Sequence, residues 1–223
     1  MAGKLIVIEG LDGCGKNTQT KLLKQYLTEK NLPFKYVSFP DYEQPSSELV
    51  KMYLRSEFGS KPSDVNAYAA ASFYAVDRFA SYKKFWKNDY SEGKIIICDR
   101  YTTSNTFYHM PKLSPENWDN YLTWLYDYEY NKLELPKPDC VIYLNVPVDI
   151  SQNLMQKRYD GDSSKKDLHE SDTDFLQKCR KAAEYVCKKS GWAQIDCTEN
   201  GKIKTIDQIH SEIINFLEGD VII

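Results

Sequence analysis

The hydrophobic pattern of the chain consists of short, mostly apolar runs separated by longer stretches with helical character. Continuous runs of this kind are typical of strands that are buried on both faces of a parallel sheet. They lie at residues 5–8, 34–39, 94–98, 140–144 and 192–195. The pattern therefore predicts a five-stranded parallel sheet.

Segments with helical composition or periodicity alternate with these runs. They lie at residues 18–30, 46–54, 65–90, 118–132, 149–158, 170–189 and 207–217, and Ser46 is a typical N-cap for the second of them. The alternation predicts an α/β fold in three layers, with helices on both faces of the sheet. The 223 residues are enough for one such domain. Since we find no repeat, linker or second boundary, residues 1–223 are expected to form a single domain.

The first apolar run leads into a glycine-rich turn, Gly10-Leu11-Asp12-Gly13-Cys14-Gly15-Lys16, and then into a helix. The spacing G-x-x-x-x-G-K between a strand and a helix is that of a phosphate-binding P-loop. Glycines allow successive backbone N–H groups to approach phosphate oxygens, the helix N-terminus adds positive potential, and Lys16 adds a mobile charge. The expected nucleotide-binding residues are Gly10, Gly13, Cys14, Gly15, Lys16, Asn17 and Thr18. The alternative is a strand–helix turn that binds no ligand.

A metal site is expected beside this loop. The P-loop motif normally ends in Ser or Thr, whose hydroxyl binds Mg²⁺, but Asn17 occupies that position. Its amide oxygen, or the hydroxyl of Thr18, offers a replacement ligand. Asp99 ends the third apolar run, where ligands collect in α/β sheets, so Asn17 and Asp99 are the expected metal ligands.

Polar residues near the third run are the candidates for a second substrate. Arg100 is placed to bind a phosphate, although an ion pair with neighbouring Asp99 is the alternative. Tyr74 and Arg78 share one face of a predicted helix, which suits an aromatic ring and a guanidinium that hold a nucleobase. An arginine that snorkels and pairs with Asp77 is an equally good interpretation. Ser104, Asn105 and Tyr108 complete the cluster.

A polar stretch at residues 159–169 lacks any apolar period and is predicted to be a surface loop. Cations flank it and lie within it: Lys157, Arg158, Lys165 and Lys166. Its position after a strand and a helix predicts a lid over phosphates, at about residues 157–169. The alternative is a solvated charge run.

Composition narrows the class of protein. Hydrophobic residues make up 42% of the chain and charged residues 27%, which is ordinary for a soluble globular protein. The net charge of −3 argues against non-specific binding of nucleic acid. The six cysteines form no close pair, so they are expected to be buried thiols in a reducing compartment. With no signal peptide and no apolar run long enough to cross a membrane, the cytoplasm is the expected location.

Taken together, the motifs resemble those of the thymidylate kinase family, P-loop nucleoside-monophosphate kinases. The resemblance covers nearly the whole chain. It rests on EGLDGCGK at residues 9–16, FP at 39–40, YAVDR at 74–78, DRYTTSN at 99–105 and HE at 169–170. It implies a P-loop kinase fold, phosphorylation of dTMP to dTDP by ATP and Mg²⁺, and a homodimer.

The resemblance also implies a role for each matching residue. Asp12 would lie near the sugar 3′-hydroxyl, Tyr74 would stack on thymine, and Arg78 would bond an exocyclic oxygen of the base. Asp99 would organise Mg²⁺ and Arg100 would bind the acceptor phosphate. Phe39, Pro40, Ser104, Asn105, Tyr108 and Glu170 would complete the substrate site. Because Gly13 stands where some members carry arginine, the catalytic cation would come from the lid, with Arg158 as the candidate.

Tyr42 is a second departure, beside Asn17, from the family pattern. It stands where the pattern F-P-x-Arg supplies an arginine for the acceptor phosphate, and Arg55 is a possible substitute. The chemistry needs no general base, because the acceptor phosphate is largely dianionic at pH 7. The cations Lys16, Arg100, Arg158 and Mg²⁺ would bring the two anions together.

Other functions stay open on the residues alone. A deoxynucleoside kinase would phosphorylate a hydroxyl and need a base, for which Glu9 and Asp12 are candidates. A nucleotide sensor without turnover would fit Asn17. A GTP-dependent switch would need Asn-Lys-x-Asp after a strand, and the nearest match, residues 131–134, ends in Glu and follows a helical segment.

Overall fold

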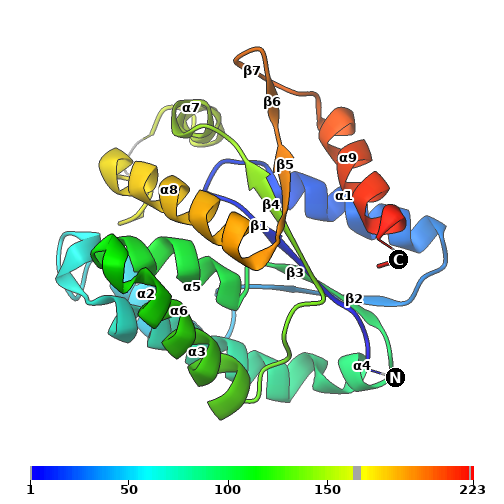
Figure 1. The fold of residues 1–223 in the computed structure, drawn as a ribbon, viewed down its shortest axis with the longest axis horizontal. Helices are drawn as coiled ribbons and strands as arrows, with labels where there is room; N and C mark the ends of the chain where they lie inside the picture. Colours follow the sequence, from blue (N-terminus) through cyan, green and yellow to red (C-terminus); the bar gives the residue numbers. More distant parts are fainter. Residues whose placement is uncertain (1, 163–166, 221) are drawn as a thin grey trace.

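A five-stranded sheet forms the centre of the computed structural model, which describes residues 2–162, 167–220 and 222–223. The strands are β1 (Leu5–Glu9), β2 (Phe34–Ser38), β3 (Ile95–Asp99), β4 (Cys140–Asn145) and β5 (Ala193–Asp196). Their order is β2-β3-β1-β4-β5, and every neighbouring pair is parallel (Figure 1). The predicted sheet is confirmed.

Helices cover both faces of the sheet, as predicted (Figure 1). They are α1 (Lys16–Glu29), α2 (Glu48–Leu54), α3 (Ala67–Ser81), α4 (Lys87–Ser91), α5 (Thr102–His109), α6 (Trp118–Tyr126), α7 (Val148–Arg158), α8 (Thr173–Ser190) and α9 (Ile206–Gly219). Short 3₁₀ segments lie at 45–47, 62–64, 110–112 and 115–117. A two-stranded hairpin, β6 (Thr198–Glu199) and β7 (Lys202–Ile203), was not predicted.

The strand pleat divides the core between the two faces of the sheet. Ile6 and Ile8 of β1 pack in the cluster that contains Leu23 of α1 and Leu217 of α9. Leu5 and Val7 of β1 belong to a second cluster on the opposite face. Since successive side chains of a strand alternate between faces, the uninterrupted apolar run at residues 5–8 must be covered on both sides.

Two predicted helices contain π-helical segments, which the hydrophobic period did not reveal. The segment predicted at 65–90 consists of α3, a π-helical segment at Tyr82–Trp86, and α4. The segment predicted at 118–132 consists of α6 and a π-helical segment at Asp127–Lys132. A π turn shifts the period by one residue and leaves the composition helical, so sequence pattern alone does not detect it.

Two further differences have local causes. Helix α8 begins at Thr173, later than predicted, because the side chain of Asp172 caps it by accepting a hydrogen bond from Phe175 N at 2.9 Å. Helix α5 was not predicted as a helix, because its sequence is polar and β-branched. All of its residues are nevertheless buried.

The turn after β1 requires glycine. A Cβ added to Gly10, whose φ is +149°, would lie 2.9 Å from the carbonyl oxygen of Leu144. A Cβ at Gly13 would lie 2.5 Å from the carbonyl oxygen of Ser151 in α7. Helix α7 therefore packs directly on the loop, and a larger residue at position 13 would require it to move.

The structure also bears on the cysteines and on membrane-spanning segments. All six cysteines are buried and free, as predicted. Within the described ranges, no helix has the length and apolar character needed to cross a membrane.

Candidate active site

The P-loop holds its lysine against its own backbone. Lys16 is only 8% exposed, and its Nζ donates to the carbonyl oxygens of Gly10 and Leu11 at 2.9 and 3.0 Å. Gly15 precedes α1 with a φ of +92°, a conformation that favours glycine. The Lys16 ammonium group can exchange these carbonyl oxygens for phosphate oxygens when a nucleotide binds. The N-terminus of α1 offers backbone N–H groups that have no partner within the helix.

An ion pair joins this loop to the segment after β3. Arg100 Nη2 donates to Asp12 Oδ1 at 2.5 Å, and the hydroxyl of Tyr108 donates to Asp12 Oδ2 at 2.7 Å. Burial raises the pKa of the Asp12 carboxyl, but the charges of Arg100 and Lys16 outweigh this and hold the pKa well below its usual range. Asp12 is therefore a carboxylate that orients Arg100, and it is a poor proton acceptor.

Arg100 adopts a backbone conformation that is rare for its residue type. Its φ is +66°, and its backbone N–H donates to Ile8 O at 3.2 Å. Such conformations cost free energy and persist where surrounding structure holds them. Burial lowers the pKa of the guanidinium, yet Asp12 raises it further, so the charge is retained. The neighbour of Arg100 in the sequence, Asp99, is not its ion-pair partner.

A cleft of about 600 Å³ collects most of the predicted site residues around the P-loop. Those that line it are Asp12, Gly13, Gly15, Lys16, Asn17, Thr18, Phe39, Pro40, Asp99, Arg100, Arg158 and Glu170. Gly10 and Cys14 do not line it. Gly10 contributes the carbonyl that binds Lys16, and Cys14 is buried in the core.

A smaller inner cavity of about 60 Å³ adjoins the cleft. Tyr74, Arg78, Ser104, Asn105 and Tyr108, the residues expected to bind the base and sugar, all line it. The cleft and the cavity share residues, namely Asp12, Phe39, Pro40, Tyr42, Arg100 and Asp167. The two are therefore adjoining parts of one site.

Arg78 does not snorkel and does not pair with Asp77. It is 1% exposed and forms a two-point ion pair with Glu129, with Nε and Nη2 at 2.7 and 2.6 Å from the carboxylate oxygens. Asp77 instead accepts from Asp41 N at 2.8 Å and Ser46 Oγ at 2.6 Å. The alternative prediction, an exposed arginine paired with Asp77, is therefore wrong, because the partner of Arg78 is Glu129. Arg78 also lines the inner cavity.

Two histidines also reach the inner cavity. His109, which sequence reasoning missed, is 1% exposed, and its Nδ1 has no hydrogen-bond partner among the described residues. His169 stacks on Tyr108, with ring centroids 5.4 Å apart, and its Nε2 lies 2.8 Å from the hydroxyl of Tyr53. Burial lowers the pKa of His169 to about 3, so the ring is neutral at physiological pH.

Glu9 is unavailable as a general base. Its carboxylate is buried and accepts from Tyr101 N at 3.1 Å, Thr103 Oγ1 at 2.6 Å and Ser104 Oγ at 2.7 Å. Burial raises the pKa of this carboxyl, although the charge of Arg100 opposes the increase. Glu9 lines neither the cleft nor the cavity, and its role is to hold the first turn of α5.

The expected metal ligands line the same cleft. Asn17 is exposed, and Asp99 lies at the end of β3 and lines the cleft together with Lys16. Across the ranges that the structure describes, no donor hydrogen-bonds to the Asp99 carboxylate and no cation lies within ion-pair distance. The same ranges contain no group of three or more His, Cys, Asp or Glu side chains able to hold a metal. These oxygens thus fit a cation that takes its other ligands from phosphates and water.

The described part of the predicted lid reaches the cleft through Arg158, Tyr159 and Asp167, and Glu170 follows it there. Arg158 is 62% exposed and lies 3.9 Å from Glu170. Lys157 is exposed and does not line the cleft. Lys165 and Lys166 lie outside the described residues. Among the described cations of the predicted lid, Arg158 is the one that lines the cleft.

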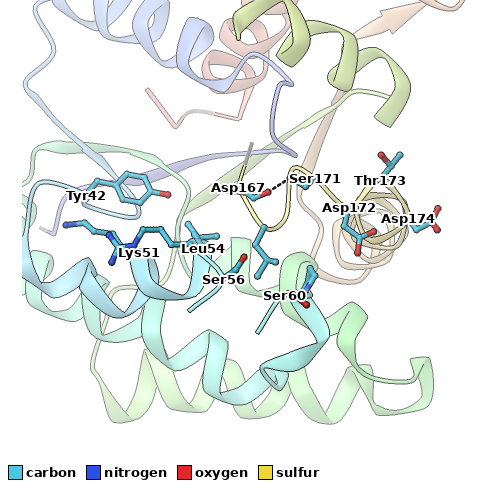
Figure 2. Close-up of a pocket in the computed structure, with 13 residues that line it drawn as sticks. Tyr42, Lys51, Leu54, Ser56, Ser60, Asp167, Ser171, Asp172, Thr173 and Asp174 are labelled. Carbon is cyan, nitrogen blue, oxygen red and sulfur yellow. Dashed lines mark hydrogen bonds between the residues drawn. The ribbon is translucent and has the colours of Figure 1, made fainter. Parts of the chain in front are cut away.

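A third cleft, of about 1050 Å³, opens beside the site between α2 and residues 167–174. Figure 2 shows Lys51 and Leu54 on one side and Asp167 and Asp172 on the other. Arg55 lines this outer cleft, where it pairs with Glu48 at 3.0 Å and Glu57 at 2.9 Å. It does not line the inner cavity, so it does not replace an arginine at Tyr42 in this conformation.

The comparisons with known proteins agree with one another. The family model described as Thymidylate kinase matches residues 8–213. A thymidylate kinase from Plasmodium falciparum (isolate 3D7) is 29% identical over 215 residues, covering 95% of this chain and 88% of the relative. A probable thymidylate kinase from Methanosphaera stadtmanae is 30% identical over 218 residues, covering 96% and 98%. The solved thymidylate kinase from Candida albicans superposes with a TM-score of 0.71 at 24% identity, over 98% of this chain and 92% of that one, which bears on the fold alone.

Asp167 generates a prediction about stability and pH. Burial and the charge of Asp12 raise its pKa from 3.8 to about 7. The folded protein therefore binds this proton more tightly than the unfolded chain does, and stability falls as pH rises from about 4 to about 7. Asp167→Asn removes this loss. We expect its free energy of unfolding, relative to the unmodified protein, to increase by about 1 kcal/mol or more between pH 4 and pH 7 in urea titrations.

The matched control is Asp160→Asn, which changes an exposed carboxylate at the end of α7. Its urea midpoints should parallel those of the unmodified protein at every pH. Parallel curves for Asp167→Asn as well would show that Asp167 does not hold a shifted proton.

Proposed function

Since this chain belongs to the thymidylate kinase family, it is an enzyme that phosphorylates dTMP to dTDP with ATP, and we propose that the cleft and inner cavity carry out this transfer. One observation carries the proposal. Lys16 of the P-loop and Arg100 after β3 line a single cleft, and Arg100 also lines the cavity that Tyr74 and Asn105 share. A phosphate donor and a nucleotide acceptor would therefore meet between the two cations.

The P-loop side would hold ATP. Backbone N–H groups of Gly13 and Gly15 and the N-terminus of α1 supply positive potential for the β- and γ-phosphates. Lys16 would exchange its contacts with the carbonyls of Gly10 and Leu11 for phosphate oxygens. This exchange places its charge where negative charge develops during transfer.

Mg²⁺ is proposed as the metal, with Asn17 and Asp99 holding it directly or through water. The two side chains offer the oxygen ligands that Mg²⁺ prefers. Among the described residues, no cationic side chain forms an ion pair with the Asp99 carboxylate. When bound, Mg²⁺ neutralises charge on the transferred phosphoryl group. The amide of Asn17 is a neutral ligand, as the usual hydroxyl is, so the departure from the motif keeps the charge of the site.

The acceptor side needs orientation and charge, with no base. The second pKa of a phosphate monoester is near 6, so the acceptor phosphate is largely dianionic at pH 7 and can attack directly. Arg100 would bind this phosphate while Asp12 and Tyr108 hold the guanidinium in place. Asp12 would also lie near the sugar 3′-hydroxyl, and Phe39, Pro40 and Ser104 would line the same pocket.

The lid would complete the charge balance. Arg158 lies at the rim of the cleft with Glu170, and it has no other described carboxylate partner. The exposed side chain of Arg158 would turn its guanidinium toward the transferred phosphoryl group. We propose that Arg158 supplies the cation that Gly13 does not, within a single kinase domain whose lid begins at residue 157 and ends at residue 169.

The competing functions find less support. A deoxynucleoside kinase needs a base at the acceptor hydroxyl, but Glu9 is enclosed by three donors and the pKa of Asp12 is lowered. The family match does not favour that alternative. A sensor without turnover remains distinguishable by assay, because it would bind ATP and release no ADP.

We also propose a cytoplasmic homodimer. Tyr68, Val76 and Phe79 of α3 are 38%, 40% and 37% exposed, and their spacing places them on one helix face. The six free, buried thiols support a reducing compartment such as the cytoplasm, which cell fractionation would test.

A charged residue on this face of α3 should disrupt the proposed dimer. Val76→Glu is expected to convert the protein to monomer in sedimentation velocity experiments, because an unpaired carboxylate would be buried in the interface. Ile206→Glu, a matched change at another exposed apolar residue, should leave the dimer intact. If the unmodified protein sediments as a monomer at micromolar concentrations, the proposal is wrong.

The proposed chemistry is tested by Lys16→Ala and Arg100→Ala, assayed by ADP release from ATP and dTMP. Each variant should lose about 100-fold or more in kcat, because each cation neutralises charge in the transition state. Chelation of Mg²⁺ should abolish turnover by the unmodified protein. Lys21→Ala, on the exposed face of α1, should retain full activity. Full turnover by a folded Lys16→Ala variant would contradict the assignment.

A further inference from the structure

Glu129 lies next to the inner cavity without lining it. It belongs to the π-helical segment Asp127–Lys132, and its carboxylate is fully buried. Four hydrogen bonds reach its two oxygens. Oε2 accepts from Arg78 Nε at 2.7 Å and Thr102 Oγ1 at 2.7 Å, while Oε1 accepts from Arg78 Nη2 at 2.6 Å and Asn105 Nδ2 at 3.0 Å. A buried carboxylate thus joins two residues of the cavity wall, Arg78 and Asn105.

This contact fixes the orientation of the Asn105 amide. Its Nδ2 group donates to Glu129 Oε1 and to the carbonyl oxygen of Ala71 at 3.1 Å. Both partners can only accept, so the amide nitrogen must face them. Both N–H bonds are then used, and no donor in the described ranges reaches Asn105 Oδ1. The free group that Asn105 offers to a ligand is an acceptor.

The same contact fixes the guanidinium of Arg78. Of its five N–H groups, one on Nε and one on Nη2 point to Glu129, and one on Nη1 points to the carbonyl oxygen of Tyr101 at 3.3 Å. The two remaining N–H groups are on the two terminal nitrogens. Arg78 therefore offers donors only, and Arg78 and Asn105 line one cavity.

We propose that Glu129 is a positioning residue that sets base selectivity by locking Arg78 as a donor and Asn105 as an acceptor. The donor on Arg78 would bond a carbonyl oxygen of the base, and the acceptor on Asn105 would bond the adjacent ring N–H. Thymine, uracil and guanine carry this edge, whereas cytosine and adenine carry an amino group beside an unprotonated nitrogen. The inference rests on the proposed function, because it concerns the acceptor nucleotide of the same site.

The carboxylate strengthens the lock that the carbonyl oxygen of Ala71 alone would provide, and an amide of the same shape would weaken it. Glutamine presents one oxygen and one NH₂ group. If its NH₂ group faced Asn105, only the carbonyl oxygen of Ala71 would still require the Asn105 nitrogen, so the amide would lose one of the two acceptors that fix it and could turn its nitrogen to the cavity. In Glu129→Gln, Asn105 could then donate to the unprotonated ring nitrogen of a cytosine-type edge, and one neutral amide oxygen would hold Arg78 in place of a carboxylate. Selectivity, rather than chemistry, should change.

The test compares dUMP with dCMP, which differ only in the edge that the pair would contact. In the unmodified protein kcat/KM should favour dUMP, with dTMP as the reference substrate. In Glu129→Gln the ratio of the two kcat/KM values should fall by about tenfold or more, through a higher KM for dUMP. The kcat at saturating dTMP should stay within a few-fold. Glu134→Gln, an exposed neighbour in the same region, should match the unmodified protein.

Three outcomes would overturn the proposal. The first is an unchanged dUMP-to-dCMP ratio in folded Glu129→Gln. The second is an equal loss of kcat for both substrates, which would show a structural role only. Should Glu129→Gln fail to fold, Glu129→Asp keeps the charge but shortens the reach by one methylene. The dUMP-to-dCMP ratio of Glu129→Asp should then fall below that of the unmodified protein, and an unchanged ratio and KM would be the third outcome. If the unmodified protein does not phosphorylate dTMP, the proposed function itself fails.

Discussion

The parallel pairing of β1 with β3 is the constraint on which the site depends. Ile8 lies opposite Asp99 in this register, so the chain leaves both strands at the same edge of the sheet. The P-loop follows one strand and Asp99-Arg100 follows the other. Because β1 is central and hydrogen-bonded on both sides, the two turns cannot move apart without breaking the sheet. The pair between Asp12 and Arg100 is the direct result.

Buried ion pairs hold two arginine side chains in fixed orientations at the wall of the cavity. Burying an ion pair costs desolvation free energy, and its contribution to stability is small or unfavourable unless hydrogen bonds complete it. The pairs Arg100–Asp12 and Arg78–Glu129 are both completed in this way, by Tyr108 and by Asn105. Each holds a guanidinium at the wall of the cavity with its charge intact. These ion pairs therefore fix the positions of two guanidinium groups where a substrate would bind.

The sheet, and most of the residues that line the cleft and the cavity, could be predicted because their signals are local. An uninterrupted apolar run identifies a doubly covered strand, and a glycine-rich turn with lysine identifies a phosphate loop. Glu129 gave no such signal. It is 51 residues from Arg78 in sequence, within an aromatic helical stretch where a glutamate reads as solvent-exposed. Helix α5 was missed for the same reason, since its buried hydroxyls are satisfied by Glu9 and Glu129, which lie far away in the chain.

The central claim is that the acceptor is a phosphate held by Arg100 and that no base is required. The most direct test is the initial rate of ADP formation from ATP and Mg²⁺ with dTMP and thymidine offered in parallel. Turnover with dTMP and none with thymidine is the result that this account predicts. It would also show that Asn17 and Tyr42 are compatible with catalysis. Turnover with thymidine alone would contradict the account, because the acceptor would then be a hydroxyl that needs a base.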